Sequence, residues 1–275
     1  MASVPPAMFG DLRVSVVLMT YAERDSIRGV IEGFFATGVV DEVLVVNNNA
    51  QAGTVEEVEQ TEARMVFEER QGYGYACRRG LVEATGDLIV LAEPDGTFMP
   101  RDIHKLLAFV HECDAVFGTR TTRELIWHGA NMDWFLRWGN WAVAKFIEAL
   151  FNTTHLSDVG CTYRVFTRET AELVAERMTV GGNHAGPEMM LIAIASGARF
   201  VEIPVNYLPR VGTSSATGSL RTAIGIGLRM IVLILDYRRR TARGRPRPAR
   251  LGAAELTGGD PGDDDSARQG APSTS

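Results

Sequence analysis

Short apolar runs alternate with amphipathic segments along the first 120 residues, and this alternation constrains the fold more than any other feature of the sequence. Strands are expected at 14–19, 42–46, 65–68, 87–91 and 114–118, and helices at 26–37, from 54 onward, at 75–85 and at 102–111. Strands separated by helices are typical of a mostly parallel sheet that is covered by helices. The sequence therefore predicts an α/β fold, and such sheets bind ligands beyond the carboxyl ends of their strands.

Local signals mark several helix boundaries. Asp25 stands where its side chain could cap the first helix, and Thr54 with Glu57 has the spacing of a capping box for the second. Gly86 follows the third helix and is expected to stop it. After Gly118 the regular alternation breaks, and 125–150 is expected to form one or two helices.

Composition supports one folded domain with flexible ends. The chain has 275 residues, of which 45% are hydrophobic and 23% are charged, with a net charge of -6. These values exclude a collagen-like, coiled-coil or fully disordered chain. No repeat or second domain is apparent. We expect a flexible N-terminus at 1–11, a single domain at 12–218, an amphipathic helix at 219–240 and a disordered tail at 241–275.

Charge and cysteine usage narrow the partners and the compartment. Seven arginines lie within 238–250, and 251–275 then holds five acids and one arginine. A basic run this local argues against a nucleic-acid-binding body. The three cysteines are far apart, so neither a disulfide framework nor a zinc site is predicted. Residues 1–13 lack the apolar core of a signal peptide, and we expect a cytoplasmic protein.

The most apolar long stretch runs from Leu220 to Tyr237. At helical spacing its polar residues fall on one narrow stripe: Arg221, Thr222, Gly225, Arg229 and Asp236. An arginine near the centre of a membrane-spanning helix costs about 2.5 to 3.5 kcal/mol. We therefore expect this helix to lie in a membrane interface or to pack on the domain, with the following arginines near anionic headgroups. An ordinary core helix followed by a solvated tail is the alternative.

Three tryptophans, Trp134, Trp138 and Trp141, recur at i, i+4 and i+7. This spacing favours a helix face buried in the core. The alternative is an aromatic floor for an apolar acceptor, because tryptophan suits surfaces that are apolar at one end and wet at the other. Arg137 would then be the polar contact beside that floor.

Polar segments follow the second and fourth predicted strands. Glu93-Pro-Asp-Gly-Thr97 places two carboxylates where a parallel sheet opens to ligand, which suits a divalent cation that bridges phosphates, although an acidic turn fits the same residues. Asn47-Asn-Asn49 favours a turn, with a nucleobase or ribose contact as the alternative. Gly72-Tyr-Gly74 lacks the remaining glycine of a dinucleotide-binding loop, so a Rossmann site is not expected.

Taken in order, these segments resemble the family 2 glycosyltransferases of the glycosyltransferase A fold, especially the polyprenyl-phosphate (dolichol-phosphate) sugar synthases. The resemblance covers roughly residues 12 to 215 and is carried by the stretches VSVVLMTYAER, EVLVVNNNAQAGT, ERQGYGYACRRGLVEATGDLIVLAEPDGTFMP, VFGTR, DVGCTYRVFTRE and VEIPVNYLPRVGTSS. It implies an inverting enzyme that uses Mg²⁺ or Mn²⁺ to transfer a sugar from a nucleotide diphosphate sugar. It also favours a polyprenyl phosphate acceptor, and the amphipathic helix with its following arginines adds the expectation of peripheral association with the cytoplasmic face of a membrane.

The resemblance assigns expected roles residue by residue. The positions that match nucleotide-binding segments are Thr20, Tyr21, Glu23, Asn48, Arg210 and Ser214. The metal motif falls on Glu93 and Asp95, with Thr97 as a third contact, and the acceptor phosphate falls to Arg120 and Arg137. The catalytic assignments are Asp95, Asp158, Arg164 and Glu188.

Four positions depart from the family pattern. Asn47 and Glu93 each replace an aspartate, Thr162 replaces a glycine, and Ser215 replaces a lysine expected near the phosphates. Loss of that lysine requires another cation, such as Arg210, near the diphosphate, or a different donor or acceptor.

Three alternative functions stay open. The first is transfer to a hydroxyl of a lipid-linked or natural-product glycan, with Asp158 or Glu188 as the base. The second is a nucleotidyltransferase, although its glycine-rich loop after the first strand is absent. The third is a non-catalytic protein that binds sugar nucleotides.

Overall fold

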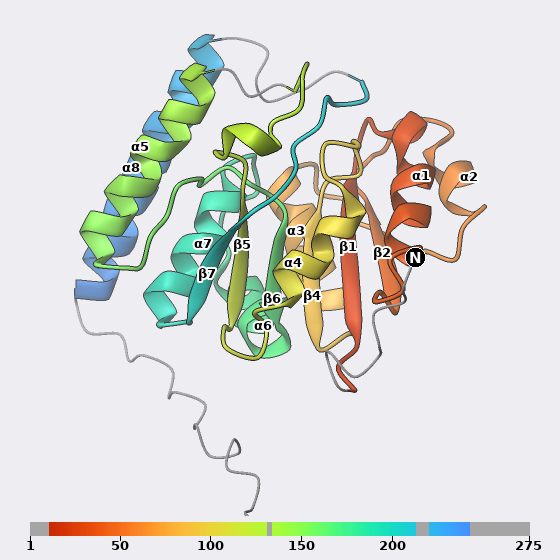
Figure 1. Cartoon of the computed structure of the whole chain (residues 1–275), viewed down its shortest axis with the longest axis horizontal. Coiled ribbons are helices and arrows are strands. Elements are labelled where there is room, and N and C mark those ends of the chain that lie inside the picture. Colours follow the sequence, from red (N-terminus) through yellow and green to blue (C-terminus); the bar gives the residue numbers. More distant parts are fainter. Residues whose placement is uncertain (1–10, 131–133, 213–219, 243–275) are drawn as a thin grey trace, which may run out of the picture.

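The buried apolar runs of the sequence form the centre of a seven-stranded sheet with the order β3-β2-β1-β4-β6-β5-β7. The computed structural model describes residues 11–130, 134–212 and 220–242 (Figure 1). The strands are β1 (Val14–Thr20), β2 (Glu42–Asn47), β3 (Arg64–Phe67), β4 (Leu88–Ala92), β5 (Ala115–Thr119), β6 (Arg164–Thr167) and β7 (Phe200–Pro204). The first four pair in parallel, and β7 is parallel to β5. Among the strands of the described residues, only β6 runs antiparallel to its neighbours, and it lies between β4 and β5. The predicted α/β fold is confirmed.

Helices cover both faces of this sheet (Figure 1). The helices are α1 (Arg24–Phe35), α2 (Thr54–Val58), α3 (Tyr73–Glu83), α4 (Ile103–Leu107), α5 (Trp134–Phe151), α6 (Arg168–Arg177), α7 (Ala185–Ser196) and α8 (Leu220–Ala242), with short 3-10 turns η2 (Pro100–Asp102) and η3 (Arg123–Leu125). Side chains alternate along a strand, so Val16 of β1 packs in the layer with α1 and α4, while Val17 packs in the layer with α3, α6 and α7. The sheet is thereby buried on both faces.

Helices α5 and α8 run side by side at one edge of the molecule (Figure 1). Ile147 of α5 and Ile234 of α8 belong to the same buried cluster as residues of α7. The helix expected at 219–240 is therefore present, and it packs on the domain through one of its faces. No helix in the described ranges combines the length and the apolar character that crossing a membrane requires.

Two expected helix caps are wrong. Asp25 lies inside the first turn of α1, and Glu23 takes the cap position without a side-chain hydrogen bond to the helix. Gly53 precedes α2 with φ of 89°, a left-handed conformation that favours glycine, so Thr54 is already helical. The flexible N-terminus expected at 1–11 and the tail expected at 241–275 lie almost wholly outside the described residues, and α8 continues to Ala242.

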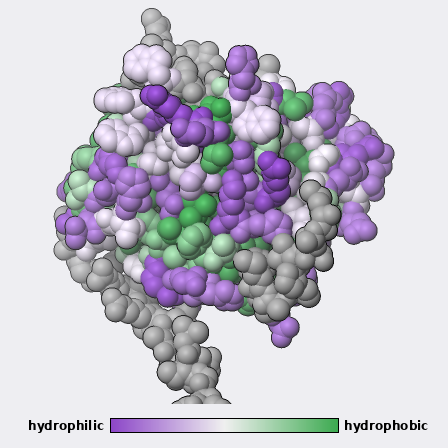
Figure 2. Space-filling model, in the orientation of Figure 1, coloured by the Kyte–Doolittle hydropathy of each residue, from purple (hydrophilic) through white to green (hydrophobic). Residues whose placement is uncertain are grey.

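The carboxyl ends of β1, β4, β5 and β7 lie at one edge of the sheet, because these strands are linked by parallel pairing or through β6. The segments that leave this edge are 21–23, 93–99, 120–122 and 205–212. Most of the candidate site residues therefore gather here. Figure 2 shows that purple, polar residues predominate on the face in view, with green, apolar residues mainly in its middle.

Candidate functional site

Three carboxylates surround one arginine at the carboxyl edge of the sheet. Arg210 Nη2 lies 2.9 Å from Glu93 Oε2 and 2.6 Å from Asp95 Oδ2, and Arg210 Nη1 lies 4.0 Å from Glu23 Oε1. Glu23 follows β1, and the other two carboxylates follow β4. The structure thus brings together four of the residues that the sequence assigned to metal and nucleotide. We call these four residues the Arg210 cluster.

Local hydrogen bonds fix the carboxylates of the cluster. Glu23 Oε2 accepts hydrogen bonds from the backbone N–H groups of Tyr21, at 2.7 Å, and Ala22, at 2.9 Å, and from the Thr20 hydroxyl at 3.3 Å. The ring of Tyr21 is exposed. The segment after β1 is therefore folded around the Glu23 carboxylate.

Asp95 is buried, and its two oxygens have different surroundings. Oδ1 accepts hydrogen bonds from the backbone N–H of Thr97 at 2.9 Å and from the Thr97 hydroxyl at 2.6 Å. Oδ2 receives no well-aligned hydrogen bond in the described part of the chain, although Arg210 Nη2 lies 2.6 Å away. Gly96 between them has φ of 78°, so the turn favours glycine. Thr97, expected as a metal contact, orients Asp95 in this structure.

A strap of residues 205–211 carries Arg210 to the carboxylates. The backbone N–H of Leu208 donates to Thr97 O at 2.8 Å, and that of Val211 donates to Asp95 O at 2.9 Å. Phe98 and Tyr207 also form an antiparallel bridge. These bonds hold the backbone on either side of Arg210 against the segment that bears Asp95. The sequence indicated Arg210 as a compensating cation, but it did not indicate this pairing.

The donor set of the cluster fits a hard divalent cation. Carboxylate oxygens are preferred ligands of Mg²⁺, and Asp95 Oδ2 is a buried oxygen without a well-aligned donor. Across the described ranges no group of three or more His, Cys, Asp or Glu side chains forms a complete metal cage, so Glu93 and Asp95 would share the ion with other oxygens.

Burial and the charge of Asp95 raise the pKa of Glu93 to about 7, against the opposing effect of Arg210.

Asn48 cross-links the end of β2 to the segment before α3. Its amide donates to Glu68 O at 2.9 Å and to Arg70 O at 2.8 Å, and its side-chain oxygen accepts from the backbone N–H of Gly72 at 2.8 Å. The expected nucleotide contact by Asn48 stays a prediction, and the structure adds a local role. Ser214, the other expected nucleotide contact after Arg210, lies outside the described residues.

Asp158 is fully buried and forms an ion pair with Arg120, whose side chain is 12% exposed. Arg120 Nε and Nη2 lie 2.8 and 3.0 Å from the two Asp158 oxygens, and the backbone N–H of Arg120 also donates to Asp158 at 3.0 Å. Burial raises the pKa of Asp158, but the charge and hydrogen bonds of Arg120 outweigh it, and the pKa lies below its ordinary value. A carboxylate held this way is a weak proton acceptor, and Arg120 is committed to it rather than free for a phosphate. The expected roles of Arg120 in acceptor binding and of Asp158 in catalysis stay predictions, and the structure adds this mutual contact.

Arg164 and Glu188 are fully buried and hold the interior together. Arg164 donates to the carbonyl oxygens of Cys161, at 2.7 Å, Val159, at 3.1 Å, and Gly186. These bonds tie the segment before β6 to the start of α7. Neither residue has a hydrogen bond or ion pair to the Arg210 cluster among the contacts of the described residues.

Glu188 of α7 accepts hydrogen bonds from the loop before α7 and from α8. The hydroxyl of Thr179 donates at 2.7 Å, the backbone N–H of Val180 at 2.9 Å, and the hydroxyl of Tyr237 in α8 at 3.2 Å. A carboxylate saturated in this way anchors α8 and the loop before α7. The catalytic roles expected of Glu188 and Arg164 stay predictions, and the structure gives both residues a place in the interior.

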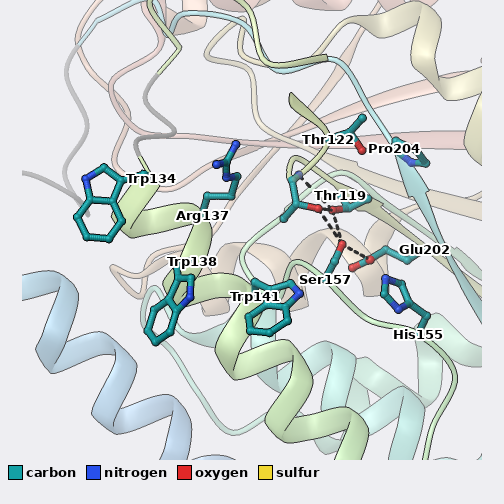
Figure 3. A pocket seen from close by; sticks show the side chains of 11 residues that line it. Thr119, Thr122, Trp134, Arg137, Trp138, Trp141, His155, Ser157, Glu202 and Pro204 are labelled. Carbon is teal, nitrogen blue, oxygen red and sulfur yellow. Dashed lines mark hydrogen bonds between the residues drawn. The ribbon is translucent and has the colours of Figure 1, made fainter. Parts of the chain in front are cut away.

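A cavity of about 550 Å³ opens beside the ion pair, between α5 and the ends of β5 and β7. Trp134, Trp138 and Trp141 line it with Arg137, and their exposed fractions are 73%, 61% and 43% (Figure 3). The expectation that these tryptophans form a core face is wrong, because α5 turns a different face, with Ala144 and Ile147, to the core. Arg137 therefore lies on the cavity, as its expected acceptor role requires.

The opposite wall of this cavity is polar, and no pattern in the sequence predicted it. Ser157 Oγ donates to Glu202 Oε2 at 2.5 Å and lies 2.8 and 2.9 Å from the hydroxyls of Thr119 and Thr121 (Figure 3). The backbone N–H of Asp158 donates to the other Glu202 oxygen at 2.9 Å. Burial raises the pKa of Glu202 to about 7. The cavity thus joins an aromatic wall to a network of hydroxyls and one carboxyl group.

The family model of glycosyl transferase family 2 matches residues 15–173, which is more than half of the chain. An uncharacterized glycosyltransferase of Mycobacterium bovis, and counterparts in two strains of Mycobacterium tuberculosis, are each 31% identical to this chain over 233 residues, covering 84% of this chain and 98% of the relative. A low-salt glycan biosynthesis hexosyltransferase of Haloferax volcanii is 27% identical over 241 residues, covering 79% and 57%.

Solved structures show the same fold. The crystal structure of glucosyl-3-phosphoglycerate synthase from Mycobacterium tuberculosis in complex with Mn²⁺, uridine diphosphate and glucosyl-3-phosphoglycerate superposes with a TM-score of 0.65 at 16% identity, covering 85% of this chain and 82% of that one. The same synthase with Mn²⁺, uridine diphosphate and phosphoglyceric acid gives 0.64 at 16% identity, covering 84% and 80%. The chain therefore belongs to the family 2 glycosyltransferases, and it is a glycosyltransferase enzyme with the glycosyltransferase A fold that its sequence predicted.

Proposed function

We propose that this enzyme transfers a hexose, with inversion at the anomeric carbon, from a nucleotide diphosphate sugar to a polyprenyl phosphate at the cytoplasmic face of a membrane. The observation that carries the acceptor assignment is the cavity whose wall of exposed tryptophans also bears Arg137. Aromatic side chains suit the apolar chain of a polyprenol, and a guanidinium suits its phosphate.

The donor would bind at the Arg210 cluster. Glu93 and Asp95 would hold Mg²⁺ or Mn²⁺, and the bound ion would neutralise charge that builds on the leaving diphosphate. Thr97 fixes one Asp95 oxygen, and the other oxygen would be available to the ion. Arg210 would donate to the diphosphate oxygens, because a guanidinium binds such oxygens in a bidentate manner.

The acceptor phosphate needs cations rather than a base. A phosphate monoester has a second pKa of about 6 and is mostly dianionic at pH 7, so no proton must be removed before it attacks. Arg120 is held by Asp158, and Arg137 is the arginine that lines the cavity. Attack from the side opposite the diphosphate inverts the anomeric carbon.

The surface of α8 supports contact with a membrane. Leu228, Ile231, Val232 and Leu235 are exposed at i, i+3, i+4 and i+7, and we call this set the outer stripe. Arg238, Arg239 and Arg240 follow it and are exposed. Figure 1 places α8 beside α5, the helix that carries the tryptophans of the cavity. An apolar stripe followed by arginines is typical of a helix in the interface of an anionic membrane.

The test is a transfer assay with the purified full chain and Mn²⁺. GDP-mannose, UDP-glucose and UDP-N-acetylglucosamine are each supplied with and without a short polyprenyl phosphate. We expect a glycosylated lipid phosphate from one donor, with inverted anomeric configuration by NMR, and a loss of about 100-fold or more in Asp95→Asn. The control is Asp25→Asn, since Asp25 is an exposed carboxylate in α1. Donor hydrolysis without transfer to the lipid phosphate would refute the acceptor assignment.

The polar wall of the cavity favours one second candidate, in which the acceptor is a hydroxyl of a glycan. Tryptophans opposite hydroxyls and a carboxyl group also suit a sugar ring. The carboxylates of Asp158 and Glu188 already accept several hydrogen bonds, so Glu202 would be the base. Its pKa of about 7 is close to the pH at which an enzyme works. Glu202→Gln would then lower turnover with a glycan acceptor by about 100-fold, whereas it would leave transfer to a lipid phosphate within about threefold.

A further inference from the structure

Arg210 uses the same carboxylate oxygens that a metal ion would need. Its Nη2 atom is 2.9 Å from Glu93 Oε2 and 2.6 Å from Asp95 Oδ2. Asp95 Oδ1 is already occupied by the hydroxyl and the backbone N–H of Thr97, so Oδ2 is the Asp95 oxygen left for a cation. A guanidinium at these distances and a divalent ion on the same two oxygens would repel each other, so the two cations compete for this site.

We propose that Arg210 competes with the divalent cation for Glu93 and Asp95, and that Arg210 moves onto the donor's diphosphate when the metal takes these oxygens. This inference rests on the proposed metal site. Arg210 is then a positioning residue that balances the charge of the carboxylates before the donor binds, and it changes partners when the donor arrives.

The contacts of the strap allow this exchange without a change of its backbone. The hydrogen bonds of Leu208 and Val211 to the segment that bears Asp95 involve backbone atoms alone, so the Arg210 side chain can rotate while they persist. The Arg210 side chain is 24% exposed, which leaves it a route away from the carboxylates. Its charge-assisted bonds to phosphate oxygens would replace the two ion pairs that it gives up.

The exchange makes metal and nucleotide binding cooperative. Metal alone must displace Arg210 with no new partner for the guanidinium, so it binds weakly. Metal together with a nucleoside diphosphate supplies that partner, and each ligand therefore strengthens the binding of the other by the same factor. An arginine that merely held the fold would produce no such coupling.

The test measures Mn²⁺ binding to the full chain by the EPR signal of free Mn²⁺, alone and with UDP or GDP, after correction for the metal that the nucleotide binds in solution. In Arg210→Gln we expect Mn²⁺ alone to bind about tenfold more tightly and the nucleotide enhancement to fall about tenfold. Arg210→Lys keeps the charge without the planar fork and should give intermediate values. Arg199→Gln is the matched control, because Arg199 pairs with Asp114 at the amino ends of β5 and β7 and should leave both constants unchanged.

The competition would be overturned if Arg210→Gln unfolds at the wild-type temperature and yet binds Mn²⁺ alone no more tightly than the wild type does. If Arg210→Gln does not fold, Arg210→Lys decides in the same way. Absence of Mn²⁺ binding by the wild type with either nucleotide would also overturn it. Failure of transfer to polyprenyl phosphate would leave the Mn²⁺ titrations intact, so the two proposals fail separately.

Discussion

The pair of Arg120 and Asp158 illustrates how the partners of a buried carboxylate lower its pKa. Every hydrogen bond that Asp158 accepts from Arg120 or from the backbone N–H of Gly160 stabilises its ionised form. The same pair holds Arg120 over the ring of Tyr207, with 5.1 Å from the guanidinium carbon to the ring centre. It thus connects the loop after β5 to the strap that carries Arg210.

We expect Asp158→Asn to lower the free energy of unfolding by about 3 kcal/mol, because it leaves the largely buried charge of Arg120 without its partner. The measurement is denaturant unfolding. Asp114→Asn is the control, since its partner Arg199 is largely exposed and such pairs contribute at most about 1 kcal/mol. A stable Asp158→Asn variant that has lost turnover but binds the donor would contradict this view and restore Asp158 as a base.

Glu202 predicts a pH dependence of stability. Its pKa of about 7 in the folded protein lies above the ordinary value of 4.5, because burial and the charge of Asp158 disfavour ionisation, and the hydrogen bonds from Ser157 and Asp158 only partly offset this. The folded state therefore binds the proton more tightly than the unfolded state. Its contribution to stability is complete below pH 4.5 and is lost as the pH rises through 7.

Between pH 5 and pH 8 we expect the wild type to lose on the order of 1 to 2 kcal/mol more stability than Glu202→Gln, which cannot ionise. Denaturant unfolding at the two pH values gives the difference. Glu93, whose pKa is also about 7, is present in the wild type and in Glu202→Gln. Arg137 and His155, which line the cavity with Glu202, are likewise unchanged. The difference between the two proteins therefore reports on Glu202. Equal losses in the two proteins would contradict the raised pKa.

At the scale of elements, the sequence predicted the first five strands, β1 to β5, and missed β6 and β7. β1 and β4 are buried along their whole length, so their apolar runs are a sufficient signal. β7 is only partly buried, and β6 has a polar residue at each end, so neither shows a comparable run. The core face expected for the tryptophans failed for another reason: α5 has apolar residues on more than one face, and spacing alone does not say which face meets the sheet.

Tyr237 and Glu188 show how α8 is joined to the domain. The Tyr237 hydroxyl donates to Glu188 in a buried contact between α8 and α7. We expect Tyr237→Phe to lower the free energy of unfolding by about 1 kcal/mol, since Glu188 keeps its bonds from Thr179 and Val180. Denaturant unfolding measures this change. Tyr21→Phe, whose ring is exposed, should change the unfolding free energy by less than about 0.5 kcal/mol. A similar loss in both variants would show that this contact does not anchor α8.

At the scale of the whole molecule, the candidate site depends on residues far apart in the chain. The topology places the ends of β1 and β4 together, so Glu23 lies near the metal motif, as a parallel sheet predicts. The approach of Arg210 depends on the strap, whose pairing with 95–98 leaves no periodic signal in the sequence. The polar wall depends on Ser157 and Glu202, which the fold brings together from positions 45 residues apart. These contacts required the three-dimensional structure.

The outer stripe makes a prediction about the molecule as a whole. If α8 lies on a membrane, the full chain should bind vesicles that contain anionic lipid, and salt should weaken that binding because Arg238, Arg239 and Arg240 contribute electrostatically. Val232→Glu places a charge in the apolar stripe and should weaken vesicle binding about tenfold in a co-sedimentation assay.

The matched control is Val82→Glu, because Val82 of α3 is 63% exposed and Val232 is 68% exposed, so both variants add one charge at a similarly exposed valine. A general effect of the added negative charge would weaken the vesicle binding of both variants equally. A role of the outer stripe requires that Val232→Glu alone loses affinity, with transfer to a water-soluble short-chain polyprenyl phosphate preserved. Equal binding by the two variants, or binding that does not depend on anionic lipid, would remove α8 as the membrane contact, while the cavity and the Arg210 cluster would still describe the site.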